Sequence, residues 1–226
     1  MDAEKPTISV IIPAFKEGKT IREVIKEIRE STSFQTQIIV VDGGSNDGTE
    51  EIAKEENVET IAEPRPGYGR AIRTGFDHGN GDIIVIIDAD GTYEARDINR
   101  LVSPIFKDEV DVCLASRISG TILPGAMQGT NYVGNRVFTL LFNQLYRQKV
   151  SDTQTGFRAM TKKALKSLDL KEDGMGISTS LLTQAARNGL KIAEVPTTYK
   201  PRKNHSKSKL NRLKAGYDIL RILLFR

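Results

Sequence analysis

The chain has 226 residues, a length that suits one large α/β domain. Hydrophobic residues make up 38% of it and charged residues 27%, which provides enough apolar side chain for a buried core and excludes a disordered chain. A single cysteine, Cys113, excludes an intrachain disulfide and a cysteine zinc site, and the presence of only two histidines argues against a histidine metal site.

The formal net charge is +4, and the basic excess lies near the C-terminus, where it indicates anionic partners. No apolar run approaches the ~20 residues that span a bilayer, and residues 1–7 lack the apolar core of a secretion signal, so we expect a cytoplasmic protein. Nucleic acid is not an expected partner, because tryptophan is absent and no nucleic-acid-binding module is apparent.

Strands and helices alternate through the first half of the chain. Short apolar runs predict strands at 8–12, 37–41, 58–61, 83–87 and 111–115. Apolar periodicity and turn residues predict helices at 21–28, 49–54, 69–78 and 98–105. Thr20 is expected to cap the first of them, with Glu23 completing a capping box. This order predicts an α/β fold with a mostly parallel, doubly wound sheet, whose ligands lie beyond the carboxyl ends of the strands.

The second half of the chain is less regular. A helix at 132–146 is apolar except for a narrow polar stripe, and a polar loop at 151–158 follows it. A helix at 178–187 and a short strand at 191–195 come next. The chain ends in a basic run at 202–209 and an amphipathic helix.

Both amphipathic helices have two interpretations. They could lie in a membrane interface, with the basic residues of the final helix on an anionic lipid surface. Alternatively, the first helix packs under the sheet, and the final helix packs on the domain or forms a homodimer seam.

Asp88 and Asp90 are the sharpest chemical feature. They flank Ala89 at the end of the apolar run 83–87. Two carboxylates at positions i and i+2 of an extended segment point the same way and can share a divalent cation that keeps open positions for phosphates. The alternative interpretation is a helix cap followed by a turn.

Polar residues also follow the first two strands. Asp42 ends the second strand and could accept a hydrogen bond from a base or a ribose, or it could only form a turn. Glu17 follows Pro13 with the same ambiguity. Neither a phosphate-binding loop of the NTPase type nor the glycine pattern of dinucleotide dehydrogenases follows the first strand, which disfavours both classes.

Four segments in this order resemble the inverting family 2 glycosyltransferases of the GT-A fold: SVIIPAFKE at 9–17, VVDGGSNDGT at 40–49, GYGRA at 67–71 and DADG at 88–91. The second half is similar to the dolichyl-phosphate mannose or glucose synthase branch of that family. The segments that carry this similarity are DTQTGFR at 152–158, IAEVP at 192–196 with Tyr199, Arg202, and SKL at 208–210.

The resemblance implies a role for individual residues. Those that would hold the nucleotide sugar are Pro13, Phe15, Glu17, Val40, Asp42, Asp88, Ala89, Asp90, Arg202 and Lys209. Asp88 and Asp90 would engage the diphosphate through Mg²⁺ or Mn²⁺, with Asp90 the more direct ligand. Arg117 would lie by the donor or acceptor phosphates. The residues expected on the acceptor side are Asp152, Gln154 and Arg158.

The chain departs from the family pattern at five positions. A second aspartate after the second strand is replaced by Gly43, a glutamine by Thr92, an arginine by Asn131, and acidic residues by Gly176 and Ser180. These departures leave the transferred sugar and the acceptor contact open.

The resemblance implies a single GT-A domain over residues 1–226. Its nucleotide-sugar half is 1–118, its acceptor half is 119–200, and the basic loop with the final helix is 201–226. The implied function is inverting transfer of a hexose from a GDP- or UDP-sugar to a polyprenyl (dolichyl-type) phosphate, by a protein peripherally bound at the cytosolic membrane face.

Other functions remain open at this stage. The first is a glycosyltransferase with a glycan hydroxyl as acceptor, for which Asp152 would be the base. The second is a sugar nucleotidyltransferase. That class usually has a glycine-rich loop with basic residues after the first strand, and this sequence has none there. The third is a nucleotide-sugar-binding protein without catalysis.

Overall fold

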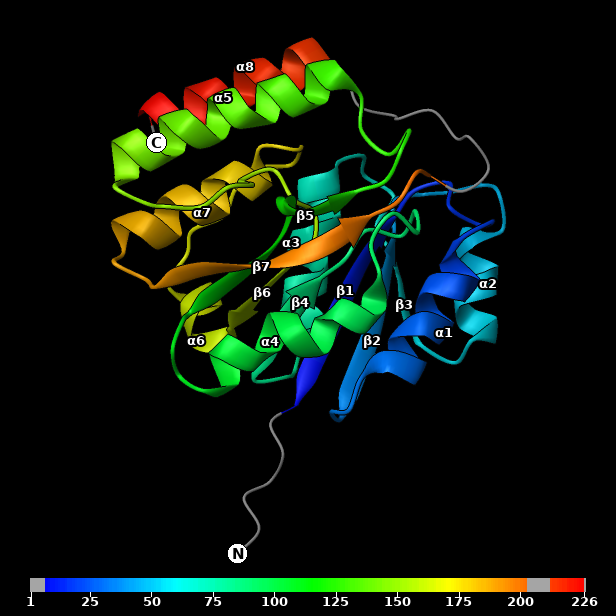
Figure 1. Ribbon diagram of the computed structural model, residues 1–226. Coiled ribbons are helices and arrows are strands. Elements are labelled where there is room, and N and C mark those ends of the chain that lie inside the picture. The colour runs from blue at the N-terminus through cyan, green and yellow to red at the C-terminus, as the bar shows by residue number, and fades with distance from the viewer. Residues whose placement is uncertain (1–6, 203–211, 226) are drawn as a thin grey trace, which may run out of the picture.

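The computed structural model describes residues 7–202 and 212–225. Within these residues seven strands form one mixed sheet (Figure 1). In sheet order they are β3 (Glu59–Ala62), β2 (Thr36–Asp42), β1 (Ile8–Ala14), β4 (Ile83–Ile86), β6 (Arg158–Thr161), β5 (Val112–Ile122) and β7 (Ile192–Tyr199). Only β6 runs antiparallel to its neighbours, β4 and β5. The predicted α/β class with a mostly parallel sheet is confirmed.

Helices cover both faces of the sheet (Figure 1). One face carries α1 (Ile21–Ser31), α2 (Thr49–Glu55) and α4 (Ile98–Phe106), the last preceded by the 3-10 turn η1 (Ala95–Asp97). The other face carries α3 (Tyr68–His78) and α7 (Ile177–Arg187), with α5 (Gly129–Tyr146) and α8 (Arg212–Phe225) side by side over α7. A short helix, α6 (Lys162–Lys166), follows β6. Each face of the sheet therefore has its own apolar core.

Helix α1 shows how the sequence pattern becomes packing. Its four predicted apolar positions, spaced three and four residues apart, are all buried. The predicted capping box is wrong, because the Thr20 side chain accepts no cap hydrogen bond. Its hydroxyl instead donates to the Ala89 carbonyl at 2.8 Å and to the Glu17 carbonyl at 3.1 Å. The start of α1 is thereby tied to the loop after β4.

Strand β6 was not predicted, nor was the helix that follows it. Residue 158 was placed at the end of a polar loop, whereas Arg158 pairs with Ile86 of β4 and Leu114 of β5. The strand is four residues long and begins with a charged side chain, so it carries no apolar alternation. Strands β5 and β7 also continue beyond their predicted ends, to Ile122 and Tyr199.

Gly75 allows α3 to approach β1 closely. A Cβ built at this position would lie under 3.0 Å from the Ile11 side chain, which is fully buried in the close-packed core. Gly134 in α5 differs, because a Cβ there would meet no atom within 4 Å.

We predict opposite effects of alanine at these two glycines. Gly75→Ala is expected to lower the free energy of unfolding by about 1–3 kcal/mol through overpacking. Gly134→Ala is expected to raise it by about 0.5–1 kcal/mol, because alanine favours a helix and meets no obstacle. Urea denaturation followed by circular dichroism measures both values. Equal shifts in the two variants would contradict the close approach of α3 to β1.

Candidate active site at the carboxyl edge of the sheet

The loops after β1 and β2 are joined at the carboxyl edge of the sheet. The strands run in parallel register, with Ala14 opposite Asp42. The Lys16 amide donates to Ser45 Oγ at 2.7 Å, and the Glu17 amide donates to Thr49 Oγ1 at 3.0 Å. This arrangement fixes the backbone on the side of the site where the resemblance places the nucleoside.

Asp42 is fully buried and organises the loop that follows it. Its two carboxylate oxygens accept from the Ser45 amide at 2.8 Å and from the Ser45 hydroxyl at 2.5 Å. The same hydroxyl oxygen accepts from the Lys16 amide, so Asp42 supports both loops. The structure thus gives Asp42 its turn-forming role, and its contact with a nucleoside stays a prediction, as do those of Pro13, Phe15 and Val40.

Asp88 lies just beyond β4 and is held from two sides. Its Oδ1 accepts the Tyr68 hydroxyl at 2.8 Å. Its Oδ2 lies against Gly156, where an added Cβ would come under 3.0 Å from it. The loop carrying Asp88 is anchored at the Ala89 carbonyl by Thr20. Tyr68 was not singled out from the sequence, although it belongs to the 67–71 segment of the family resemblance.

Asp90 is buried and its two oxygens have different partners. Oδ1 accepts from the Thr92 amide at 3.1 Å and the Thr92 hydroxyl at 2.6 Å. Oδ2 is 2.7 Å from the Arg202 guanidinium. Thr92, one of the departures from the family pattern, therefore orients the carboxylate that the sequence nominates as the main metal ligand.

The two carboxylates repel each other. Burial and the charge of Asp90 raise the pKa of Asp88 to about 6, against the hydrogen bond from Tyr68. A divalent cation would relieve this repulsion, and carboxylate oxygens are the ligands that Mg²⁺ and Mn²⁺ prefer. No cluster of three acidic, histidine or cysteine ligands occurs among residues 7–202 and 212–225. A cation held by this pair would keep other coordination positions for water or for substrate oxygens. The donor chemistry fits such a cation.

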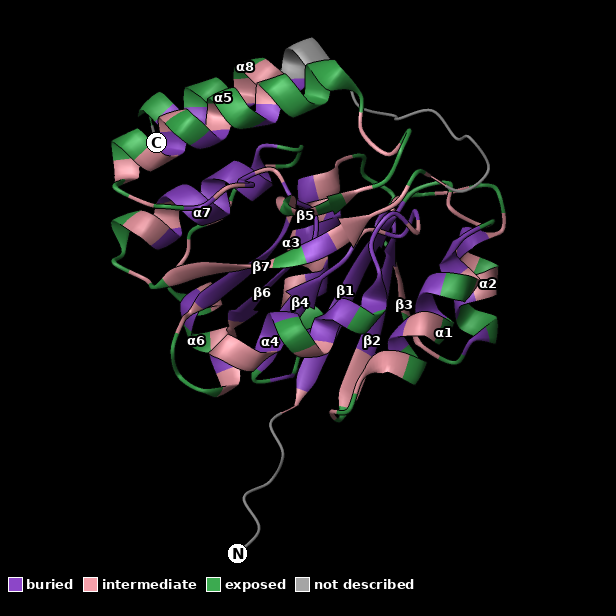
Figure 2. Cartoon of the chain, viewed as in Figure 1, coloured by how far each residue is buried: buried purple, intermediate pink, exposed green. Residues whose placement is uncertain are grey.

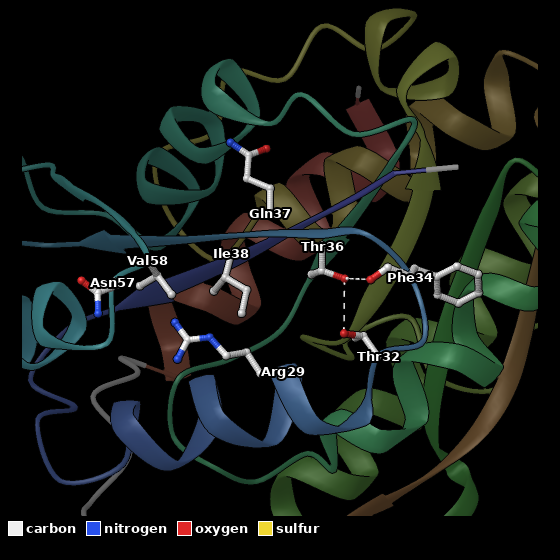
Figure 3. Close-up of a pocket in the computed structure, with 8 residues that line it drawn as sticks. All are labelled: Arg29, Thr32, Phe34, Thr36, Gln37, Ile38, Asn57 and Val58. Atoms are coloured by element: carbon white, nitrogen blue, oxygen red, sulfur yellow. Dashed lines mark hydrogen bonds between the residues drawn. The ribbon is translucent and has the colours of Figure 1, made fainter. Parts of the chain in front are cut away.

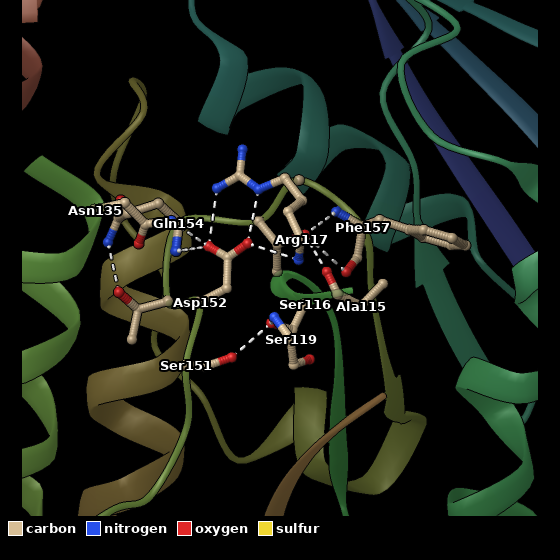
Figure 4. A network of polar contacts seen from close by, with 12 residues as sticks. Ala115, Ser116, Arg117, Ser119, Asn135, Ser151, Asp152, Gln154 and Phe157 are labelled. Carbon is tan, nitrogen blue, oxygen red and sulfur yellow. Dashed lines mark hydrogen bonds and ion pairs between the residues drawn. The ribbon is translucent and has the colours of Figure 1, made fainter. Parts of the chain in front are cut away.

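Arg117 and Asp152 form a buried ion pair (Figure 4). Arg117 donates to Asp152 three times, through its amide at 3.0 Å, Nε at 2.7 Å and a terminal nitrogen at 2.9 Å. Its guanidinium also lies over the Tyr199 ring, 5.1 Å from the centroid. Asp152 thus sets the position of Arg117.

Asn135 is a further donor to Asp152 and was not predicted as a site residue. Its side-chain amide donates to Asp152 at 2.6 Å (Figure 4). Burial alone raises the pKa of Asp152, but the Arg117 charge and these hydrogen bonds outweigh it and hold the pKa below its ordinary value. Asp152 is consequently a weak base. The sequence placed Asn135 in the polar stripe of the 132–146 helix, but this pattern did not identify Asp152 as its partner.

The side chains of Arg158 and Gln154 make their contacts inside the protein. Arg158 is buried, and its guanidinium donates to the carbonyls of Ser178, at 3.0 Å, and Thr155. Burial lowers the pKa of this arginine. The Gln154 side chain reaches Thr179 Oγ1 at 3.4 Å. Arg158 is therefore not a surface charge, and the contact of both residues with an acceptor stays a prediction.

Arg202 and Lys209 are the nominated residues not yet placed, and Asn131 and Ser180 are departures from the family pattern. Arg202 joins the site, between Asp90 and Glu17, while Lys209 lies outside the described residues. Asn131 is exposed near the start of α5, and Ser180 is buried inside α7.

A hollow elsewhere on the molecule does not belong to this site. It lies between α1 and the start of β2, at the amino edge of the sheet (Figure 3). Arg29 lines it and is paired with Glu56 at 3.3 Å. None of the nominated residues lines this hollow.

Comparisons with known proteins agree with this geometry. The family model described as glycosyl transferase family 2 matches residues 9–169. Glycosyltransferase AglJ of Haloferax volcanii is 33% identical over 220 residues, covering 97% of this chain and 71% of its own length. The dolichyl-phosphate hexose transferase of the same organism is 31% identical over 202 residues, covering 88% of this chain and 86% of its own length.

A solved structure is similar over nearly the whole chain. Glucosyl-3-phosphoglycerate synthase from Mycobacterium tuberculosis, in complex with Mn²⁺, UDP and glucosyl-3-phosphoglycerate, has a TM-score of 0.78 and 26% identity, covering 97% of this chain and 79% of its own. The chain therefore belongs to glycosyl transferase family 2, and it is a glycosyltransferase of the GT-A fold that takes its sugar from a nucleotide sugar.

Proposed function

We propose that this protein transfers a hexose from a GDP- or UDP-sugar to a polyprenyl phosphate of the dolichyl type, in a metal-dependent reaction that inverts the anomeric centre. The observation that carries the proposal is the pair Asp88 and Asp90 at the end of β4, with two arginines within reach of it. Arg202 contacts Asp90 directly, and the charge of Arg117 acts on Asp88.

The arrangement suits the departure of a nucleoside diphosphate. Mg²⁺ or Mn²⁺ held by Asp88 and Asp90 would neutralise the negative charge that develops on the diphosphate as the sugar leaves. Arg117 is fixed in place by Asp152 before any substrate arrives, so it contributes charge without reorganisation. Gly156 leaves room for the Asp88 carboxylate beside this arginine.

A phosphate acceptor agrees with the chemistry of Asp152. A polyprenyl phosphate is already anionic at neutral pH and needs a positioned positive charge, whereas a sugar hydroxyl needs a base. The lowered pKa of Asp152 makes it a poor base, and this disfavours the alternative of a glycan hydroxyl acceptor. The similarity to a dolichyl-phosphate hexose transferase points to the same acceptor class.

The outer helices α5 and α8 support a peripheral place at the membrane. The three buried residues of α5 include two polar ones, Asn135 and Thr139. Much of this helix is exposed (Figure 2), and several of its exposed residues are apolar. The exposed apolar residues of the two helices are Tyr132, Val133, Val137, Leu140, Leu145, Tyr217, Leu220, Leu224 and Phe225. Exposed basic residues, Arg136, Arg147 and Arg221, stand among them. An apolar face with basic residues suits the boundary of an anionic bilayer.

No helix among the described residues combines the length and hydropathy needed to cross a bilayer. The attachment proposed here is by the exposed apolar faces of α5 and α8. Alternatively, the same faces form a homodimer interface. The vesicle experiment below distinguishes membrane binding from dimer formation.

The metal assignment predicts the behaviour of one substitution. In a thermal-shift screen of UDP and GDP, Mn²⁺ plus the matching nucleotide is expected to raise the melting temperature of the wild-type chain, because ligands of the native state stabilise it. Asp90→Asn is expected to lose most of this Mn²⁺-dependent shift. Asp82→Asn, at the opposite end of β4, is the control and keeps it. A full shift in Asp90→Asn would contradict the metal site.

The acceptor is tested by product formation. Protein, Mn²⁺, labelled GDP- or UDP-hexose and dolichyl phosphate are expected to yield labelled lipid. Gly156→Ala is expected to reduce the rate at least about tenfold, because its methyl group forces Asp88 from its place. Product on an added glycan, with none on lipid, would refute the lipid acceptor while leaving the transferase activity intact.

The membrane proposal predicts vesicle binding. Co-sedimentation with vesicles of phosphatidylcholine and phosphatidylserine is expected to fall about tenfold or more for the double variant Val137→Glu with Leu140→Glu, which loses two exposed apolar side chains. Gln144→Glu adds negative charge to the same helix without removing an apolar group, and it is expected to bind nearly as the wild type does. A dimer in solution that the double variant disrupts, without vesicle binding by the wild type, would assign the face to a second copy.

A further inference from the structure

Arg202 occupies the acidic centre of the site. One terminal nitrogen is 2.7 Å from Asp90 Oδ2, and the other is 3.5 Å from Glu17 Oε1. Both carboxylates are nearly buried, with side chains 6% and 11% exposed, whereas the Arg202 side chain is 30% exposed. The guanidinium therefore reaches in from the rim of the site and compensates two acids that have little contact with water.

The oxygens of Asp90 leave few positions for a second cation. Oδ1 already accepts two hydrogen bonds from Thr92, and Oδ2 is the oxygen that Arg202 contacts. A divalent cation on Oδ2 would stand next to the guanidinium, and two positive charges at such a distance repel each other. A cation that binds without nucleotide therefore competes with Arg202 for this oxygen, and the displaced guanidinium gains no new partner in place of the carboxylate.

The nucleotide sugar changes this balance. Its diphosphate brings negative charge together with oxygens that accept bidentate hydrogen bonds from a guanidinium. Arg202 can then exchange the carboxylate for a phosphate while the cation takes its place on Asp90. After the exchange Asp90, Arg202 and the diphosphate each lie next to a group of opposite charge.

We propose that Arg202 is the counter-cation of Asp90 in the free enzyme and is exchanged for the divalent metal ion when the nucleotide sugar binds, so that metal binding depends on the donor. The proposal rests on the proposed function in one respect, the assignment of Asp90 as a metal ligand. It adds that Arg202 weakens binding of the metal ion before the donor arrives and donates hydrogen bonds to the diphosphate afterwards.

The test is Mn²⁺ titration of the full chain by isothermal calorimetry, without nucleotide. Arg202→Gln is expected to bind Mn²⁺ about ten- to a hundredfold more tightly than the wild type, the effect of removing one charge-assisted contact. Arg202→Lys keeps a positive charge and is expected to stay close to the wild type. Lys200→Gln is the matched control, because Lys200 is 33% exposed and pairs with Glu94 at 3.2 Å, and it is expected to leave Mn²⁺ affinity unchanged.

A second titration measures the coupling to the donor. Saturating UDP or GDP, whichever the thermal screen selects, is expected to tighten Mn²⁺ binding far more in the wild type than in Arg202→Gln. Circular dichroism confirms that each variant is folded. Mn²⁺ affinity of Arg202→Gln equal to or weaker than that of the wild type would overturn the proposal, as would an equal gain in Lys200→Gln.

Asp90→Asn separates this inference from the function on which it rests. If Asp90→Asn binds Mn²⁺ as the wild type does in the presence of nucleotide, the metal assignment itself fails. If Asp90→Asn loses Mn²⁺ and Arg202→Gln shows no gain, the metal assignment stands and only the counter-cation role of Arg202 fails.

Discussion

Negative charge gathered at the end of a buried strand is the constraint on which the site depends. Asp88 and Asp90 follow β4, which has no exposed residue, and burial together with the charge of Asp90 raises the pKa of Asp88. The fold holds the pair against this repulsion with hydrogen bonds from Tyr68 and Thr92, each from a different direction. Two arginines supply the positive charge in the absence of substrate. Thr20 anchors the loop that carries the pair, and Asp152, itself held by Asn135, fixes Arg117 in place.

The sheet could be predicted from the sequence because its central strands are buried on both faces. Runs such as 8–12 and 83–87 consist almost wholly of branched apolar residues, a pattern that few other structures share. The same reasoning fails for β6, whose four residues begin with the buried Arg158. An arginine whose charge is satisfied by two backbone carbonyls cannot be told from a surface arginine by local pattern, since its partners lie 3 and 20 residues along the chain.

The candidate site could be predicted where its residues end strands. Asp42, Asp88 and Asp90 were found because parallel strands place their carboxyl ends at one edge. Tyr68 and Asn135 were missed because they lie in helices, and their partners are 20 and 17 residues away in sequence. The local pattern predicted that the Thr20 hydroxyl caps its own helix. It instead donates a hydrogen bond to the Ala89 carbonyl, in the loop that carries the two aspartates. Tertiary hydrogen bonds of this kind leave no periodic signal.

Helix α5 connects the Arg117–Asp152 ion pair to the outer surface of the molecule. It buries Asn135 and Thr139 towards Asp152 and leaves Val133, Val137 and Leu140 exposed, the reverse of an ordinary surface helix. Because Asn135 holds Asp152 and Asp152 holds Arg117, the position of this helix and the position of the arginine are set together. The proposed acceptor has a phosphate head and an apolar chain, which would suit Arg117 and the exposed apolar face of α5 respectively. The head would meet a positive charge already fixed in place, while the chain would remain beside the apolar face of the helix that fixes it.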